Sequence, residues 1–192
     1  ALVTGYLKSS QQVESLHAFQ KQEKLPLIVD PIMGDGGKLY QGFDQSYVTS
    51  MRTLCQDADL ILPNLTEACL LANLPYQDKD LTEEFLKTLA QRLNQLGAKK
   101  VLLTGLPLGV DQIGIAYFDG AKEVFHLFKG RRFPHHFFGT GDILTALVAA
   151  SYLQGLDLQK VLPVLIDFLE KSLVTTLDCH FDLRYGVYYQ PH

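Results

Sequence analysis

Short apolar runs alternate along this chain with longer segments whose apolar residues recur at helical spacing. Runs at 25–30, 60–62 and 100–104 have the length of strands, and Pro, Asp, Asn or Gly residues lie at their ends. Runs of this kind are typical of strands buried in a parallel sheet. Residues 1–5 predict the tail of a further strand that leads into a turn.

Helices are predicted in the segments between these runs. The expected ranges are 10–21, 46–56, 66–73, 139–153 and a last helix between 155 and 176. Thr66 is the expected cap of the third of these. Another helix, which ends at Gly97, is indicated by a single apolar stripe of Phe85, Leu89, Leu93 and Leu96. Two later runs, 113–118 and 123–128, flank an Asp-Gly pair and predict a hairpin.

The order of these elements predicts an α/β fold, a three-layer α/β/α arrangement around a mostly parallel sheet. No repeat, low-complexity tract or linker interrupts the chain, so residues 1–192 are interpreted as a single domain. Ligands of such sheets bind at the carboxyl ends of the strands. The residues expected at those ends are Gly5-Tyr6, Asp30, Pro63-Asn64 and Thr104-Gly105.

The composition narrows the class of protein. The chain carries 17 Lys and Arg against 21 Asp and Glu, a net charge of −4, and has no long basic run, which argues against a nucleic-acid partner. Its hydrophobic content of 47% is that of a folded globular protein. No apolar run approaches the roughly 20 residues of a membrane helix. Three widely spaced cysteines form no C-x-x-C pair. We therefore expect a cytoplasmic protein without a membrane or nucleic-acid partner.

The first residues predict that the chain is an internal or C-terminal portion of a longer protein. Residues 1–5 form an apolar strand, and an apolar strand needs neighbours that cover both of its faces. The alternative is a short edge strand at a genuine terminus.

The strongest candidate for chemistry is G-T-G-D at 139–142, at the start of a predicted helix. Two glycines allow a tight turn, so that consecutive amide N–H groups point to one place, where the helix dipole adds positive partial charge. Asp142 lies in the first turn and is expected to face the same place. A carboxylate there suits a base for a hydroxyl that attacks a phosphoryl group. The alternative is a plain helix cap, because Asp and Thr favour helix N-termini.

Two further motifs follow predicted strands. D-P-I-M-G-D at 30–35 runs into a Gly-rich loop and places Asp30 where it suits a cation or a phosphate-bound metal; the alternative is an Asp-Pro turn. P-N-L-T-E at 63–67 places Asn64 and Glu67 on one face if a helix begins between them. Glu67 suits Mg²⁺ binding through water, and a capping carboxylate is the alternative. The topology is expected to bring these motifs and G-T-G-D together.

In order and spacing, the three motifs resemble those of the ribokinase-like small-molecule kinases, and most closely the pyridoxal/pyridoxamine kinase branch. Segments G-Y-L at 5–7, G-K-L-Y at 37–40 and R-Y-G-V at 184–187 support the resemblance, which covers essentially the whole chain. Family members are longer. The resemblance therefore implies a ribokinase-like fold that lacks the N-terminal third, which in the family holds the first strands and the polar side chains that grip the pyridine ring.

The resemblance implies an ATP-dependent kinase of vitamin B6 salvage that phosphorylates the 5′-hydroxymethyl group of pyridoxal, pyridoxamine or pyridoxine. Asp142 is then the general base. The amides of Gly139, Thr140 and Gly141 stabilise charge on the transferring phosphoryl group.

Other positions take their implied roles from the same resemblance. The residues implied for the ATP site are Asp30, Asn64, Glu67, Thr104, Phe128 and Arg131. Asp30 and Glu67 are implied for Mg²⁺, with Asp30 also near a monovalent cation such as K⁺. Tyr6 and Phe138 are implied neighbours of the substrate ring. The family further suggests a homodimer.

Two alternatives stay open. Hydroxymethylpyrimidine (phosphate) kinases of thiamine synthesis share the D-P-[VI]-M and P-N-x-x-E elements, but they typically carry Cys at the position of Asp142. From a different class, the chain is a truncated, non-catalytic nucleotide-binding or dimerising module, which would bind ATP without turnover.

Overall fold

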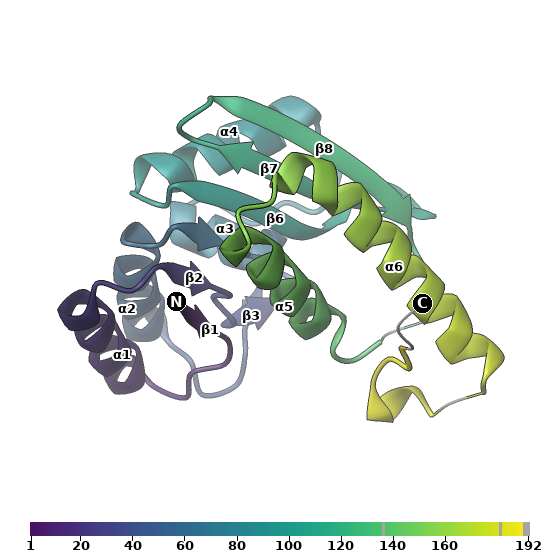
Figure 1. The fold of residues 1–192 in the computed structure, drawn as a ribbon, viewed down its shortest axis with the longest axis horizontal. Coiled ribbons are helices and arrows are strands. Elements are labelled where there is room, and N and C mark those ends of the chain that lie inside the picture. Colours follow the sequence, from purple (N-terminus) through teal and green to yellow (C-terminus); the bar gives the residue numbers. More distant parts are fainter. Residues whose placement is uncertain (136, 181, 190–192) are drawn as a thin grey trace. The chain divides into compact units, whose positions relative to one another are not determined.

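The computed structural model describes residues 1–135, 137–180 and 182–189 (Figure 1). The strands are β1 (Leu2–Thr4), β2 (Leu27–Val29), β3 (Gly34–Asp35), β4 (Lys38–Leu39), β5 (Leu60–Ile61), β6 (Lys100–Pro107), β7 (Gln112–Asp119) and β8 (Val124–Arg131). The helices are α1 (Ser10–Glu23), α2 (Gln45–Gln56), α3 (Leu65–Ala72), α4 (Glu83–Gln95), α5 (Thr140–Leu153), α6 (Leu158–Asp178) and the 3₁₀ turn η1 (Leu183–Tyr185).

The main sheet has the strand order β1-β2-β5-β6-β7-β8. β1, β2, β5 and β6 pair in parallel, with Ile28 opposite Leu60 and Ile61 opposite Val101. The predicted hairpin is present as the neighbouring strands β7 and β8. This mixed sheet with flanking helices confirms the predicted α/β class.

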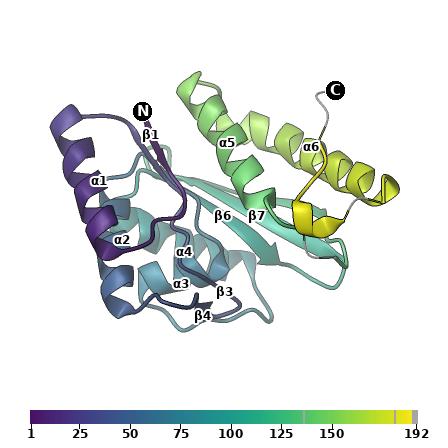
Figure 2. The same cartoon turned by 90° about the horizontal axis from the view of Figure 1, so that it is seen from below.

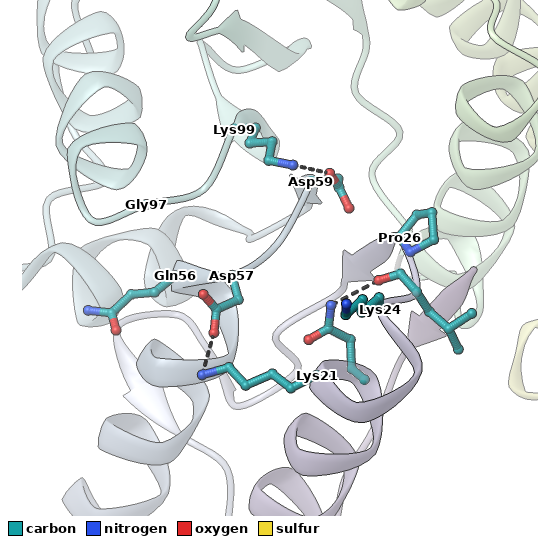
Figure 3. Close-up of a pocket in the computed structure, with 10 residues that line it drawn as sticks. Lys21, Lys24, Pro26, Gln56, Asp57, Asp59, Gly97 and Lys99 are labelled. Carbon is teal, nitrogen blue, oxygen red and sulfur yellow. Dashed lines mark hydrogen bonds and ion pairs between the residues drawn. The ribbon is translucent and has the colours of Figure 1, made fainter.

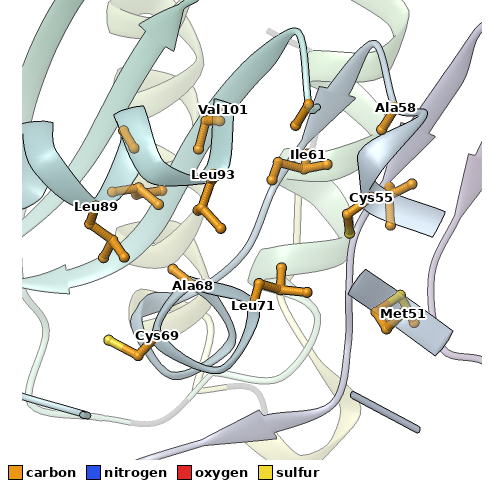
Figure 4. Packing of buried hydrophobic residues seen from close by; sticks show 14 of the residues in the cluster. Met51, Cys55, Ala58, Ile61, Ala68, Cys69, Leu71, Leu89, Leu93 and Val101 are labelled. Carbon is orange, nitrogen blue, oxygen red and sulfur yellow. The ribbon is translucent and has the colours of Figure 1, made fainter. Parts of the chain in front are cut away.

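The core lies between the parallel strands and helices α1 to α4. All three residues of β2 are fully buried, as expected for a strand covered on both faces. Figure 4 shows Met51, Leu71 and Leu93 from three helices in the same cluster as the strand residues Ile61 and Val101. Figure 2 shows α1 and α2 side by side over this part of the sheet.

The apolar face of α4 differs from the predicted stripe. Its buried residues are Leu86, Leu89, Ala90 and Leu93, which recur at three- and four-residue spacing. Phe85 and Leu96 are only partly buried and flank this face. Leu89 and Leu93 of the predicted stripe are therefore buried as expected, whereas Leu86 and Ala90, which the prediction left out, complete the buried face.

The chain divides into two compact units. The first comprises Ala1–Leu108 and Gly114–Leu127, and the second comprises Gly109–Ile113 and Phe128–His192. Each unit is described by itself below. Within the described ranges, no helix is both long and apolar enough to cross a membrane.

Candidate functional site

Asn64 and Glu67 begin helix α3 with a reciprocal pair of hydrogen bonds. Asn64 Oδ1 accepts the backbone N–H of Glu67 at 3.0 Å, and Glu67 Oε2 accepts the backbone N–H of Asn64 at 2.9 Å. This is a capping box with Asn64 as the N-cap. The expectation that Thr66 caps this helix is therefore wrong: Asn64 takes the cap because its extended backbone and short amide side chain reach the first-turn amides.

Glu67 is buried, with only 3% of its surface exposed. Its second oxygen, Oε1, accepts the backbone N–H of Met33 at 3.1 Å, so the carboxylate joins the two motifs that follow β2 and β5. Burial is the main cause that raises the pKa of Glu67 to about 8. The amide hydrogen bonds oppose this rise in pKa, and the nearby charge of Asp30 adds to it. A cation bound beside the two carboxylates would offset both causes that raise the pKa of Glu67, its burial and the charge of Asp30.

The Gly-rich segment after Asp30 is a two-residue hairpin rather than an open loop. β3 and β4 pair antiparallel, and Gly36 and Gly37 between them both have positive φ, as a type I′ turn requires. At Gly34, a Cβ atom would lie 2.4 Å from the carbonyl oxygen of Lys38, so this close approach of two backbones needs glycine.

The start of α3 holds the hairpin in place. Asn64 Nδ2 donates to the carbonyl oxygen of Gly34 at 2.8 Å, and the backbone N–H of Gly37 donates to Thr66 Oγ1 at 2.9 Å. Thr66 thus anchors the hairpin, a role that the sequence did not predict. The only signal in the sequence was the place of Thr66 inside the P-N-L-T-E motif.

Asn64, which follows β5, and Thr104, which lies within β6, are register partners. They form an isolated parallel bridge, and the N–H of Thr104 donates to the carbonyl oxygen of Pro63 at 2.9 Å. Asp30 follows β2 and is buried, with 9% of its surface exposed. Its backbone N–H donates to the carbonyl oxygen of Thr4. Asp30 and Asn64 thus follow the carboxyl ends of β2 and β5, as the parallel topology predicted. The expectation that the next strand ends at Thr104 is wrong, because β6 continues to Pro107 and Thr104 lies within it.

A divalent metal fits the donors of this region. In the described part of the chain, no group of three or more His, Cys, Asp or Glu side chains is arranged to hold a metal ion. Asp30 and Glu67 therefore form at most a two-carboxylate set. Mg²⁺ is usually bound by one or two carboxylates together with substrate phosphates, so this set suits Mg²⁺ carried by a nucleotide.

The G-T-G-D motif lies in the second unit, at the start of α5. Its N-cap is Gly139, with φ of 84°, and no side chain caps the helix from that position. The first intrahelical bond runs from Ile143 N–H to the carbonyl of Gly139 at 3.0 Å. The amides of Thr140, Gly141 and Asp142 therefore precede the intrahelical hydrogen bonds and suit an anion. Asp142 is exposed.

The remaining predicted site residues are aromatic or cationic. Phe128 is partly buried on β8, and the Arg131 guanidinium lies 4.9 Å from the ring centroid of Phe133. Phe138 is 53% exposed in the second unit. Tyr6, in the first unit, is 61% exposed, and its ring lies 5.7 Å from that of Phe43.

A cavity of about 540 Å³ lies in the first unit, where β2, β5 and β6 begin, and none of the predicted site residues lines it (Figure 3). Its charged side chains are largely engaged with one another. Lys21 pairs with Asp57 at 3.0 Å, and Lys99 pairs with Asp59 at 2.7 Å. We interpret these charged residues as a surface ion-pair cluster and not as a ligand-binding site. Parallel sheets bind their ligands at the opposite, carboxyl ends of the strands.

Comparisons with known proteins agree with this fold, which is that of the ribokinase-like small-molecule kinases. A family model described as phosphomethylpyrimidine kinase matches residues 1–183. The chain belongs to the phosphomethylpyrimidine kinase family.

Individual relatives support the same placement. A pyridoxal kinase of Arabidopsis thaliana is 29% identical over an alignment of 192 positions. The alignment covers 92% of this chain and 59% of that enzyme. The crystal structure of pyridoxal kinase from Lactobacillus plantarum superposes with a TM-score of 0.84 at 36% identity, covering 96% of this chain and 66% of that one. A Bacteroides thetaiotaomicron structure with pyridoxal, assigned to the phosphomethylpyrimidine kinases, gives a TM-score of 0.90 at 31% identity and covers 96% of this chain and 66% of that one. The chain thus spans less than two thirds of these relatives.

Proposed function

We propose that the chain acts as an ATP-dependent kinase that phosphorylates the 5′-hydroxymethyl group of a B6 vitamer. The observation that carries the proposal is the start of α5, where an exposed carboxylate, Asp142, follows amides that lack a capping side chain. Phosphoryl transfer needs this combination, because a base must accept the hydroxyl proton while N–H groups stabilise charge on the phosphoryl oxygens.

In this mechanism Asp142 accepts the proton from the substrate hydroxymethyl group as the hydroxyl oxygen attacks the γ-phosphorus. The bond from the γ-phosphorus to the β–γ bridging oxygen breaks, and ADP leaves. The amides of Gly139, Thr140 and Gly141 stabilise the charge that grows on the phosphoryl oxygens. Tyr6 and Phe138 contact the substrate ring, and Phe128 and Arg131 contact the nucleotide.

Asp30, Asn64, Glu67 and Thr104 bind the phosphates and Mg²⁺ of ATP in this proposal. The capping box and the Met33 hydrogen bond hold Glu67 in one orientation, which reduces the cost of ordering it around a ligand. Mg²⁺ supplies neutralisation of phosphate charge when it is bound. A monovalent cation such as K⁺ is proposed near Asp30.

Hydroxymethylpyrimidine (phosphate) kinase is the second candidate. The description of the matching family favours it. The Asp at 142, where the hydroxymethylpyrimidine kinases typically carry Cys, and the pyridoxal kinases among the relatives favour the B6 vitamers. A direct test is competition between pyridoxal and hydroxymethylpyrimidine for limiting ATP, with both phosphorylated products measured. An excess of phosphorylated pyrimidine would favour the second candidate.

A further inference from the structure

Glu170, on α6, holds the end of β8. Its Oε1 atom accepts the backbone N–H of Arg131 at 2.6 Å, across 39 positions of sequence. In Figure 1 the arrowhead of β8 ends beside α6. A short hydrogen bond donated by a backbone amide to a carboxylate is among the stronger hydrogen bonds in proteins. Both residues belong to the second compact unit.

Gly130 makes room for this contact. A Cβ atom at this position would lie 2.7 Å from Glu170 Oε1 and 3.2 Å from Ile166 Cγ2. The carboxylate is the far end of a flexible side chain, so an added methyl group would displace it rather than unfold the protein. Gly130 and Glu170 therefore form one contact that can be broken from either side.

From Arg131, packing continues to the start of α5. The Arg131 guanidinium lies over the ring of Phe133, and Phe133 meets Phe137 edge to face, with 6.1 Å between ring centroids. Phe137 is buried, and its carbonyl oxygen lies 3.5 Å from Thr140 Oγ1. Arg131, Phe133 and Glu170 also line a cavity of about 560 Å³.

We propose that Glu170 is a positioning residue for nucleotide binding: it holds the β8 end so that Arg131 and Phe133 present one surface to the nucleotide and support the G-T-G-D helix start. The inference rests on the proposed function. Glu170 has no part in the chemical step, so its loss weakens ATP binding more than it slows turnover.

Four variants test this role. Glu170→Ala removes the acceptor, whereas Glu170→Gln keeps an amide oxygen that accepts the same N–H. Gly130→Ala displaces the carboxylate without changing it. Asp167→Asn is the matched control, because Asp167 also lies on α6 and lines the cavity. Asp167 forms an ion pair with Lys171 at 2.7 Å, on the same helix.

The first measurement is hydrogen exchange of the Arg131 amide by NMR, which needs no enzyme activity. We expect faster exchange in Glu170→Ala and Gly130→Ala, and wild-type exchange in Glu170→Gln and Asp167→Asn. Unchanged exchange in both disrupting variants would show that Glu170 does not hold β8 and would overturn the proposal.

The second measurement is the dissociation constant of ATP by calorimetry, with KM for ATP and kcat where turnover is detected. Loss of the contact is expected to raise the dissociation constant and KM about fivefold or more, with kcat within about twofold, and Glu170→Gln should restore both. Faster amide exchange without weaker ATP binding would overturn the positioning role. A wild-type chain that binds no ATP would overturn the proposed function itself and this role with it, whereas the exchange data would still report whether the contact forms.

Discussion

Asn64 and Glu67 each accept the other's backbone N–H, at 3.0 Å and 2.9 Å, and the same two side chains also reach the segment after β2. Glu67 bonds to the N–H of Met33, and Asn64 bonds to the carbonyl of Gly34. Two motifs about 30 residues apart in sequence are thereby one piece of structure. The same residues that are proposed to bind phosphate and Mg²⁺ also stabilise the fold.

The dual role of Glu67 predicts a loss of stability in Glu67→Gln. Glutamine keeps one acceptor oxygen but turns an NH₂ group toward the second of the two backbone N–H groups. A buried donor left without an acceptor costs about 1–3 kcal/mol, so we expect the free energy of unfolding to fall by that amount. Urea denaturation above pH 8, where Glu67 is ionised, measures it, with the exposed Glu84→Gln as control. Equal midpoints for the two variants would contradict the capping role.

The same variant separates metal binding from stability. If Glu67 binds Mg²⁺, Glu67→Gln raises the Mg²⁺ concentration needed for half-maximal rate, because one of two carboxylates has lost its charge. The titration is done at a temperature where the variant remains folded. A Mg²⁺ dependence identical to that of the wild type would leave Glu67 with its structural role alone.

Asp142→Asn tests the proposed base. Asparagine keeps the shape of the side chain but cannot accept the substrate proton, so turnover should fall by about 100-fold or more with little change in nucleotide affinity. Asp157→Asn is the control, since Asp157 caps α6 and asparagine caps a helix equally well. Undiminished turnover in Asp142→Asn would remove Asp142 from the mechanism.

The ion pairs of Asp57 with Lys21 and His17 predict how the stability of the fold depends on pH. Hydrogen bonds from Lys21 and His17 lower the pKa of Asp57 below its ordinary value of 3.8, against the opposing effect of burial. The folded state therefore binds fewer protons than the unfolded state in acid. Asp57 thus adds stability above pH 3.8, and this stability is lost as the pH falls through the lowered pKa.

Asp57→Asn should accordingly destabilise the protein at neutral pH, and the difference from the wild type should shrink as the pH falls below 3.8. The effect is small, because the carboxylate is 43% exposed and solvent screens its pairs. Thermal unfolding from pH 2.5 to 7 measures it, with Asp78→Asn as a control. A stability difference between Asp57→Asn and the wild type that grows as the pH falls would contradict this account.

Much of this fold follows from sequence pattern. The buried strands β2, β5 and β6 and the helix start at Gly139 could be predicted because apolar runs and glycines mark them. The cap of α3 was misplaced by two residues, since Asn64 and Thr66 are both good capping residues and only backbone geometry decides between them.

Contacts between distant residues were beyond prediction from one sequence. The Gly-rich loop was expected, but its hairpin and its attachment to Thr66 depend on how β2 and α3 meet in space. Glu170 gave no signal, because a carboxylate on a helix looks like a solvated side chain until β8 is placed against it. The roles of Asp30, Glu67 and Asp142 stay predictions that depend on activity.

The most direct test of the central claim is product detection by mass spectrometry. The chain is incubated with ATP, Mg²⁺ and K⁺ against pyridoxal, pyridoxamine, pyridoxine and hydroxymethylpyrimidine. We predict a phosphorylated B6 vitamer and little phosphorylated pyrimidine. No product from any substrate, while ATP still raises the melting temperature, would contradict the kinase proposal and identify the chain as a nucleotide-binding module.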